Sequence, residues 1–194
     1  MATSAAKAEH RARLLEGLAA ALREQGLQGI QISDIVRHAR TSRRTFYECF
    51  DDKESAFVEL IRESSIALRD RVEAGIDSEA AWDEQVDCAI DAYVAALTED
   101  PALTATVSRE LPTLGKRGAA LQHEGIERFA ELFVAITSGP GMRRAGVLPA
   151  TRDAAVMLMG GVAELINRAM FAGTPLAQAA ATAKAVIKAA IEPR

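Results

Sequence analysis

The stretch I-S-D-I-V-R-H-A-R-T-S-R-R-T-F-Y-E-C-F-D-D-K-E, residues 32–54, decides the fold of this protein. Apolar residues at helical spacing predict a first short helix with a single buried face, and a polar break follows it. Ser42 is a good N-cap for a second short helix over residues 43–49, which would bury Phe46 and Phe50. Two short helices joined by a tight turn, the second of them basic, are typical of an element that enters a DNA major groove.

Positive charge accompanies this pattern, although the whole chain has a net charge of −4. The first 54 residues hold nine Lys or Arg against eight Asp or Glu, so the acidity lies downstream. Between Ile32 and Tyr47 the only acid is Asp34. The same segment contains four arginines, which are Arg37, Arg40, Arg43 and Arg44. A local excess of positive charge of this kind favours contact with a polyanion.

The same stretch resembles the helix-turn-helix of the TetR family of transcriptional regulators. Its most specific feature is the Thr-Phe-Tyr run, followed by a second Phe and then by Lys-Glu at the start of a longer helix. The residues that carry the resemblance, in the family's order and spacing, are Ile35, Ala39, Ser42, Thr45, Phe46, Tyr47, Phe50, Lys53 and Glu54. The motif covers about the first third of the chain, and the rest is similar only in its helical organisation.

Three positions depart from the family pattern. Arg40 stands where the turn usually begins with Gly, and a side chain is unfavourable there if the residue needs a positive φ. Gln31 stands where the first helix usually has a Thr or Ser cap, and Cys49 stands where His or Tyr often contacts a phosphate. None of these departures breaks the expected fold.

The resemblance implies that some of these residues contact the DNA backbone and others contact the bases. Ser42, Tyr47 and Lys53 would contact phosphates, while Arg43, Arg44 and Thr45 would face base edges. The alternative is that the arginines only form a solvated charged face, which the surrounding motif disfavours. The predicted DNA-binding residues are Arg37, Ser42, Arg43, Arg44, Thr45, Tyr47 and Lys53.

The chain as a whole predicts an all-α protein of about nine helices. Its 194 residues are 49% hydrophobic, rich in Ala, Leu and Glu, and show no alternating strand pattern. We expect a helix-turn-helix DNA-binding domain over residues 1–52 and a ligand-binding and dimerisation domain over 53–194. The expected helices cover about 5–25, 32–39, 43–49, 53–74, 78–97, 102–111, 117–137, 151–172 and 175–191, with a loop over 138–149.

The last two expected helices, 151–172 and 175–191, combine small residues with bulky apolar ones. Gly160 and Gly161 lie beside Leu165, and the final helix is nearly half alanine. An ordinary core hairpin would explain this composition. The resemblance implies instead a homodimer, in which these two helices of each subunit form a four-helix bundle. A helix-turn-helix that reads a palindromic operator also needs two copies at a fixed spacing.

A site for a small-molecule effector is expected among the helices after residue 53, because the family binds its effectors there. Such pockets are usually apolar with a few polar groups. The aromatic and sulfur-containing residues of this region, with two polar residues on a mainly apolar helix, fit a small and largely apolar effector. A place in the core or in the dimer interface explains each single residue equally well. The expected ligand-binding residues are Trp82, Tyr93, Phe129, Phe133, Met157, Glu164 and Asn167, with Met159 as a further candidate.

The chemistry of an enzyme is missing from the sequence. His123-Glu124 begins like the zinc pattern H-E-x-x-H, but Glu127 stands at the position of the second His. No Gly-rich phosphate loop and no Ser or Cys nucleophile with an evident base is present, so we expect neither catalysis nor a cofactor nor a metal site. The two cysteines, Cys49 and Cys88, suggest no disulfide framework and fit a reducing cytoplasm.

No targeting signal or membrane segment is expected either. The first residues lack the apolar stretch of a signal peptide. The longest apolar run, residues 154–163, is too short to span a bilayer.

The leading hypothesis is therefore a homodimeric, ligand-responsive regulator of transcription, most simply a repressor that its effector releases from DNA. The competing hypothesis is a helical small-molecule-binding protein or enzyme that keeps the fold without binding an operator. The salt dependence of binding to random duplex DNA separates the two, because only the regulator should show it.

Overall fold

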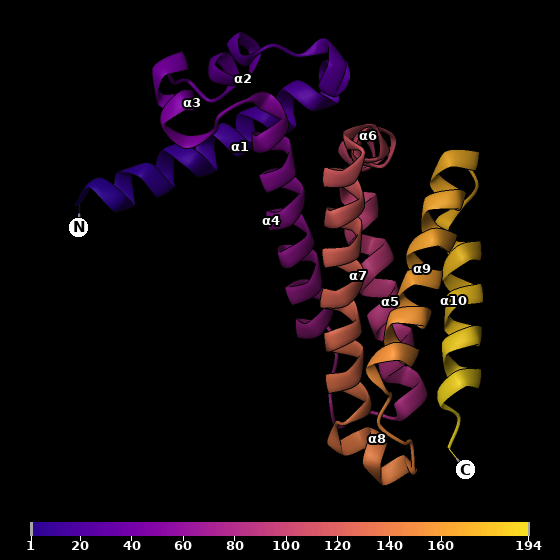
Figure 1. The fold of residues 1–194 in the computed structure, drawn as a ribbon. Coiled ribbons are helices and arrows are strands. Elements are labelled where there is room, and N and C mark those ends of the chain that lie inside the picture. The colour runs from indigo at the N-terminus through magenta and orange to yellow at the C-terminus, as the bar shows by residue number, and fades with distance from the viewer. Residues whose placement is uncertain (1, 194) are drawn as a thin grey trace. The chain divides into compact units, whose positions relative to one another are not determined.

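The computed structural model describes residues 2–193 of the chain, with side chains from Ala5 onward. Every regular element in this range is helical, which confirms the all-α expectation (Figure 1). The elements are α1 (Ala2–Gly29), α2 (Ile32–His38), α3 (Arg43–Cys49), α4 (Lys53–Ala74), α5 (Trp82–Glu99), α6 (Pro101–Glu110), the 3-10 helix η1 (Leu111–Leu114), α7 (Lys116–Thr137), α8 (Pro140–Ala145), α9 (Arg152–Ala172) and α10 (Leu176–Ile191).

The expectation of a loop over residues 138–149 is wrong, because α8 lies within it. Gly139 is the N-cap of α8, and Gly146 ends the helix with a φ of 81°. Pro140 occupies the first helical position, where its missing N–H is no loss. The glycines and the proline that suggest a loop in the sequence therefore mark the ends of a short helix.

Two compact units make up the described chain. Unit 1 contains the chain up to Ser64 together with Pro101–Leu121, and unit 2 contains Ser65–Asp100 together with the chain from Gln122 onward. Both α4 and α7 contribute residues to each unit. The functional division at residue 52 stays a prediction, since it concerns what each domain binds rather than how it packs.

Unit 1 has an apolar core built on the stripe of α1, in which Leu14, Leu18 and Leu22 are fully buried. Phe46 of α3 and Phe57 of α4 complete this core. The helix α1 packs against α2, α3 and α6. Although α6 lies far from α1 in the sequence, its apolar face packs against α1 in this core.

A close approach between α1 and α2 depends on Gly17. A Cβ atom at this position would lie 2.7 Å from the carbonyl oxygen of Ile35 and 2.8 Å from the backbone nitrogen of Ala39. Real Cβ atoms do not come this close to backbone atoms, so any side chain at Gly17 would push the two helices apart.

The start of α4 is joined to the end of α1 by Lys53. Its ammonium donates hydrogen bonds to the carbonyl oxygens of Leu27 and Ile30, both at 2.9 Å. These carbonyls follow Gly26, whose φ of 70° and ψ of 170° interrupt the helix. The partly buried ammonium therefore satisfies carbonyls that an interrupted helix leaves free.

Unit 2 has its own core, in which α10 packs against α5 and α9. The buried side chains of α10 are small near its start and larger near its end, from Ala179 and Ala183 to Ile187 and Ile191. Small side chains let α10 lie close to its neighbours, while the isoleucines fill the wider space.

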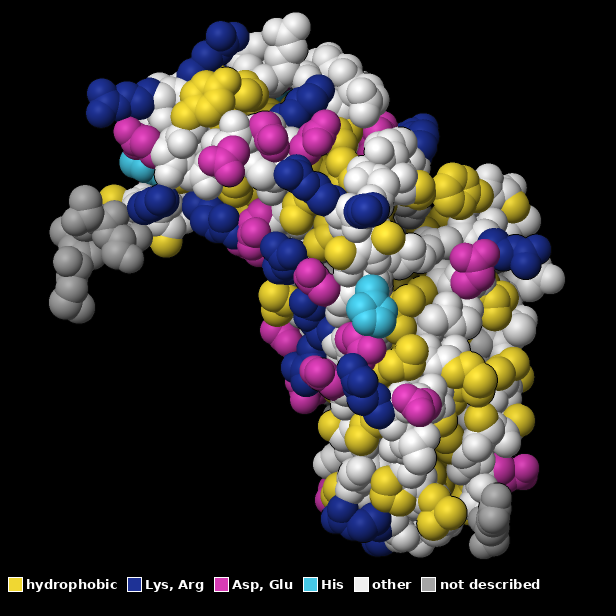
Figure 2. Space-filling view, in the orientation of Figure 1, with side chains coloured by type: hydrophobic (Ala, Val, Ile, Leu, Met, Phe, Trp, Pro, Cys, Tyr) yellow, Lys and Arg dark blue, Asp and Glu magenta, His cyan; other side chains and the backbone are white. Residues whose placement is uncertain are grey.

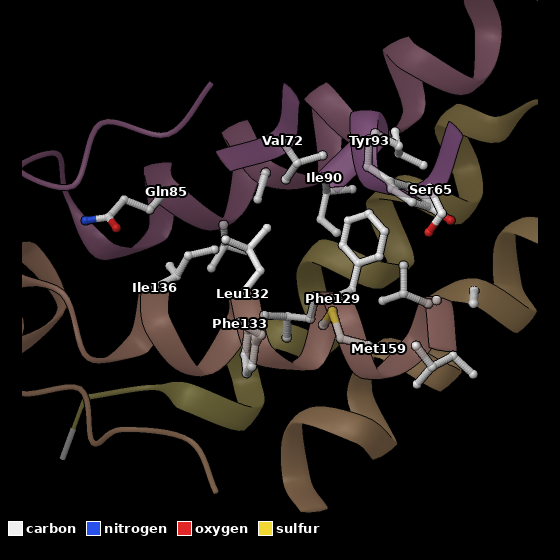
Figure 3. A pocket seen from close by; sticks show the side chains of 18 of the residues that line it. Ser65, Val72, Gln85, Ile90, Tyr93, Phe129, Leu132, Phe133, Ile136 and Met159 are labelled. Atoms are coloured by element: carbon white, nitrogen blue, oxygen red, sulfur yellow. The ribbon is translucent and has the colours of Figure 1, made fainter. Parts of the chain in front are cut away.

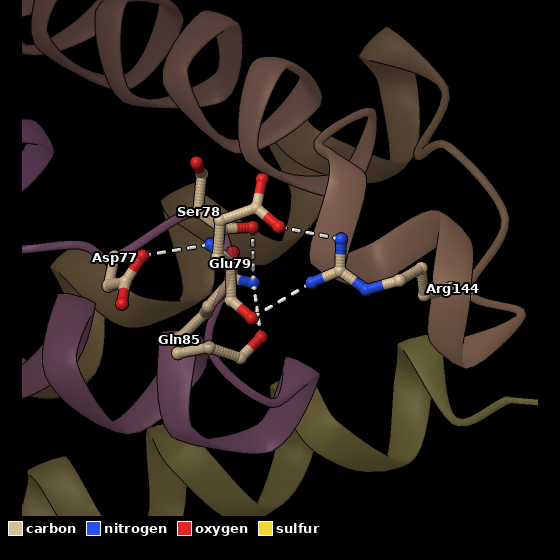
Figure 4. A network of polar contacts seen from close by, with 6 residues as sticks. Asp77, Ser78, Glu79, Gln85 and Arg144 are labelled. Carbon is tan, nitrogen blue, oxygen red and sulfur yellow. Dashed lines mark hydrogen bonds and ion pairs between the residues drawn. The ribbon is translucent and has the colours of Figure 1, made fainter.

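Polar contacts attach α8 to the segment before α5 (Figure 4). The Gln85 side-chain nitrogen donates to the Ala80 carbonyl at 2.9 Å, and the Gly141 backbone nitrogen donates to the Ser78 carbonyl at 3.0 Å. Arg144 adds an ion pair with Glu79 at 2.7 Å. The backbone groups of this turn are thus satisfied by partners from two helices.

By length and composition alone, α9 is the one described helix that would be able to cross a membrane. This is weak support for a membrane protein, because a core helix passes the same test. Val162 and Ile166 of α9 lie in the core of unit 2, although only 22% of its most apolar window is buried.

Replacing Gly17 by Ala should lower the free energy of unfolding by about 1–3 kcal/mol, because α2 would have to move away from α1. Gly160→Ala is the matched control, since its new methyl group would meet only the Ile126 side chain at 3.9 Å. That variant should be neutral or slightly stabilising, as expected for an interior helical Gly. Urea unfolding of both variants measures the difference, and equal stabilities would show that the α1–α2 contact has room for a methyl group.

Candidate nucleic-acid interface and ligand cavity

The second helix of the motif, α3, begins at Ser42 as the sequence predicts. The Ser42 hydroxyl oxygen accepts a hydrogen bond from the Thr45 backbone nitrogen at 3.1 Å and shares a second one with the Thr45 hydroxyl at 2.9 Å. In α2 the cap residue is Gln31, and the Asp34 carboxylate accepts a hydrogen bond from its backbone nitrogen at 2.9 Å. Asp34 thus supports a helix start that lacks the usual hydroxyl cap.

The turn between α2 and α3 passes through Arg40, whose φ is 50°. It is the only non-glycine residue with a positive φ in the described chain. This position does require the left-handed conformation, which glycine adopts without strain. Having Arg rather than Gly at position 40 therefore costs conformational energy.

The aromatic residues of α3 determine which of its faces is buried. Phe46 is fully buried, and its ring lies 5.7 Å from the ring of Phe50. Tyr47 packs edge-on against Phe46 at 5.6 Å but remains 59% exposed. Arg43 and Arg44 are exposed as well. The burial of Phe46 therefore leaves two cations and one phenol of α3 on the surface.

Lys and Arg side chains lie over the region of unit 1 formed by α1–α3 (Figure 2). Arg44 pairs with Glu48 at 3.0 Å and Arg37 pairs with Asp34 at 3.6 Å, whereas Arg40 and Arg43 form no ion pair with any described residue. Exposed ion pairs of this kind contribute little to stability. Arg40 and Arg43 are thus available for phosphates or bases, and Arg37 and Arg44 can exchange weak surface pairs for such contacts.

Lys53 differs from the other predicted DNA contacts. Its ammonium already donates to the carbonyls of Leu27 and Ile30, each at 2.9 Å, and to that of Gln28 at 3.5 Å. A phosphate contact would have to share the ammonium with these carbonyls. The phosphate contact stays a prediction, and the structure adds a stabilising role that the sequence did not suggest.

A cavity of about 190 Å³ lies within unit 2 (Figure 3). Residues of α4, α5, α7, α9 and α10 line it, together with Met142 of α8. None of the described residues that line it carries a charge. The walls are mostly apolar, which is the usual character of a small-molecule site.

Three of the predicted ligand-binding residues line this cavity, namely Tyr93, Phe129 and Phe133, and so does the further candidate Met159. The other four lie outside it, namely Trp82, Met157, Glu164 and Asn167. Met157 and Glu164 are exposed. The physical reason is the helical period, because residues two positions apart, such as Met157 and Met159, point to nearly opposite sides of a helix. Composition alone could not separate these faces.

The cavity also uses residues that the sequence interpretation missed, including Ser65, Leu68 and Val72 of α4 and Gln85 of α5. Gln85 is 2% exposed, unlike the charged residues that surround it in sequence. The available signal was its spacing of eight residues from Tyr93, which places both on one helical face.

The cavity holds one phenol group without a protein partner. The Tyr93 ring lies 5.4 Å from the Phe129 ring in an edge-to-face arrangement. Its hydroxyl makes no hydrogen bond to any described residue. Burial raises the pKa of Tyr93 to about 12, so the group stays neutral and keeps its proton at physiological pH.

An exposed face runs along α9 on the surface of unit 2. Met157 and Phe171 are 69% and 67% exposed, and Gly161, Glu164 and Arg168 between them are exposed too. Their spacing of 4, 3, 4 and 3 residues defines one stripe of the helix. Figure 2 shows hydrophobic side chains gathered over α9 and α10.

Residues 14–60 match the family model described as bacterial regulatory proteins, tetR family. None of the curated proteins compared with the sequence matches it. Solved structures share its fold: a candidate TetR-family transcriptional regulator from Mesorhizobium loti is 21% identical, with a TM-score of 0.72 over 94% of this chain and 95% of that one.

The fatty acid degradation regulator FadR from Bacillus halodurans is 17% identical, with a TM-score of 0.74 over 95% of this chain and 97% of that one. The transcriptional regulator FadR from Bacillus subtilis, solved with stearoyl-CoA, is 18% identical, with a TM-score of 0.71 over 94% and 98% of the two chains. The match over residues 14–60 thus identifies the N-terminal helix-turn-helix of this chain as similar to that of the TetR family of bacterial regulatory proteins, and the chain shares the fold of solved TetR-family regulators along most of its length.

Proposed function

We propose that the protein is a homodimeric repressor that binds a palindromic operator and is released from it by a small, apolar effector. The observation that carries the DNA-binding role is the surface of α3. The helix is capped by Ser42 and anchored by the buried Phe46, and it exposes Arg43, Arg44 and Tyr47. This is the arrangement that a helix needs in order to present cations to a major groove.

Within this surface, phosphate contacts and base contacts have different chemistry. The hydroxyls of Ser42 and Tyr47 lie at the start of α3 and on its exposed surface, where they suit phosphate oxygens. The guanidinium groups of Arg43 and Arg44 can bond bidentately to guanine, and Thr45 can reach a base edge beside them. Arg37 adds positive charge from α2.

The exposed stripe of α9 supports a dimer. Met157 and Phe171 would be costly to leave in water, and the exposed alanines of α10 allow a second copy to approach closely. A bundle of α9 and α10 from two subunits would bury both surfaces. It would also set the spacing of two recognition helices.

The cavity supports regulation by a ligand. Ser65, Leu68 and Val72 of α4 line it, as do residues of α7, and these two helices also contribute residues to unit 1. A ligand that prefers one arrangement of these helices would shift the population toward it. If that arrangement binds the operator poorly, the coupling is reciprocal and DNA weakens ligand binding equally.

The solved complex of Bacillus subtilis FadR with stearoyl-CoA supports this proposal, since that protein of the same fold holds a ligand. We also place the protein in the cytoplasm, together with the DNA that it would bind, and we expect no catalytic activity.

Arg44→Ala should weaken operator binding by about 1–3 kcal/mol per half-site and weaken binding to random DNA much less. The operator is first obtained by selecting bound sequences from a random duplex pool. Arg152→Ala is the control, because Arg152 pairs with Glu127 in unit 2 and is equally a surface arginine. Equal losses on both DNAs would make Arg44 a phosphate contact and transfer base reading to Arg43 or Thr45. Failure of the wild type to bind any duplex in a salt-dependent way would refute the proposed function.

Lys53→Ala should lower the free energy of unfolding by roughly 1–3 kcal/mol, because two carbonyls lose a charged donor. If Lys53 also contacts a phosphate, the folded variant should bind all sequences more weakly. The slope of log affinity against log salt should then fall by about one for each phosphate that Lys53 neutralised. Thermal unfolding and a salt titration separate the two roles, and Lys53→Arg should partly retain both. Unchanged stability would show that the ammonium does not hold the end of α1.

Met157→Glu should convert the dimer into a monomer, since it replaces an exposed apolar side chain of the α9 stripe by a charge that has no partner there. Met157 is a cleaner probe than Leu165, which is only partly exposed and packs against the core of unit 2. Ile66→Glu is the control, because Ile66 is an exposed apolar residue of α4, outside that stripe. Sedimentation measures the mass of both variants. A dimeric Met157→Glu protein would exclude this stripe as the interface.

A further inference from the structure

We infer that the effector is an uncharged molecule about the size of a substituted benzene, and that it is recognised by one hydrogen bond to the Tyr93 hydroxyl. This inference rests on the proposed regulatory role of the cavity and specifies the class of ligand. Three features of the cavity carry it: the absence of charge on its walls, its volume, and the unpartnered hydroxyl of the half-buried Tyr93.

The walls argue against a charged ligand. None of the described lining residues is Asp, Glu, Lys, Arg or His. An ion moved from water into such a site loses its hydration without gaining a counter-ion. Arg128 donates a hydrogen bond to the hydroxyl of the lining residue Ser65 at 2.9 Å but does not itself line the cavity.

The volume limits the size of the ligand. An apolar cavity of about 150 Å³ accommodates benzene. The cavity of this protein, at about 190 Å³, therefore has room for a six-membered ring with a few further heavy atoms. A long acyl chain would not fit within it, and the charged nucleotide moiety of an acyl-CoA would not suit its walls.

The polar side chains that line the cavity differ in how many of their hydrogen-bonding groups already have a protein partner. The Gln85 side-chain nitrogen is already committed to the Ser78 and Ala80 carbonyls. The Ser65 hydroxyl accepts from Arg128. Neither the Tyr93 hydroxyl nor the side chain of Gln122 makes a hydrogen bond within the described chain, but Gln122 is exposed whereas Tyr93 is half-buried. In Figure 3 Gln85 and Tyr93 lie toward opposite ends of the cavity.

Tyr93 is therefore the hydrogen-bonding group that the ligand meets, and the Tyr93 and Phe129 rings provide an edge-to-face aromatic wall beside it. A ketone, phenol or alcohol on a hydrophobic ring system satisfies this geometry. A hydrocarbon fills the same space but leaves the hydroxyl without a partner.

The test uses three probes with the same number of heavy atoms: acetophenone, cumene and benzoate. Calorimetric titration of the full-length protein should show acetophenone binding about two- to tenfold more tightly than cumene, the usual gain from one hydrogen bond. Benzoate should not bind measurably. In the Tyr93→Phe variant acetophenone should fall to the level of cumene, while cumene binding should stay the same.

Each contrary result overturns a stated element of the inference. Tight benzoate binding would contradict the uncharged class and implicate Arg128. An unchanged preference for acetophenone in Tyr93→Phe would remove Tyr93 from recognition, and no binding of any probe would reject the size and class together. Probe binding that leaves DNA affinity unaltered would refute the regulatory role of the cavity but not the ligand class.

A second and independent observation concerns the turn of the helix-turn-helix. We propose that Arg40 contacts a DNA phosphate from its left-handed backbone position. Its φ of 50° is strained for a residue with a side chain, and glycine would adopt it freely. Residues held in a strained backbone conformation are often found at functional sites, where the side chain makes a functional contact.

The Arg40 side chain makes no stabilising polar contact within the part of the chain that the structure describes. It is exposed and forms no ion pair or hydrogen bond with a described residue. It lies two residues before Ser42, at the start of the helix that carries Arg43 and Arg44. A guanidinium in this place extends the positive surface beyond α3, where a phosphate is the fitting partner.

Arg40→Gly tests this proposal with two opposite effects. Thermal unfolding should show a higher midpoint, because the strain is relieved. Affinity for duplex DNA should fall, and the slope of log affinity against log salt should decrease by about 0.9 for each phosphate that Arg40 neutralised. Arg40→Lys should retain most of the slope. A more stable Arg40→Gly protein with unchanged DNA affinity and slope would overturn the proposal.

Discussion

The burial of Phe46 beneath α1 is the interaction on which the DNA-binding surface depends. Its ring is fully buried in the core of unit 1, so α3 cannot rotate about its axis without exposing it. With this rotation set, Arg43, Arg44 and Tyr47 are held at the surface. The close approach at Gly17 also matters here, because it lets α2 lie directly against α1, and α2 in turn packs against α3.

In unit 2 the helical period gives the different faces of one helix, α9, three different surroundings. On α9, Met159 lines the cavity, Ile166 lies in the core, and Met157 belongs to the exposed stripe. A helix that is apolar on several faces at once is long and hydrophobic enough to resemble a membrane span. Its composition is explained instead by the separate surfaces that it has to cover.

The proposed regulation depends on α4 and α7, which contribute both to the walls of the cavity and to unit 1. A ligand in an apolar cavity acts mainly by filling space between helices, and packed helices respond by small shifts rather than by bending. The strength of the response is set by how much better the ligand fits one arrangement than the other. A small, uncharged ligand with one hydrogen bond would give a modest and readily reversible effect.

The sequence by itself determined the helix-turn-helix, the cap at Ser42 and the burial of Phe46, because these follow from neighbours within a few residues. For Arg40 it indicated a cost only if the turn needs a positive φ, and the structure shows that it does. It also indicated Tyr93, Phe129 and Phe133 as cavity residues. Only the tertiary structure decided that Met157 and Glu164 lie outside that cavity, that Gln85 lines it and that Lys53 holds the carbonyls of Leu27 and Ile30. The physical reason is that these roles depend on which face of a helix meets a partner far away in the chain, and composition and local spacing do not specify that partner.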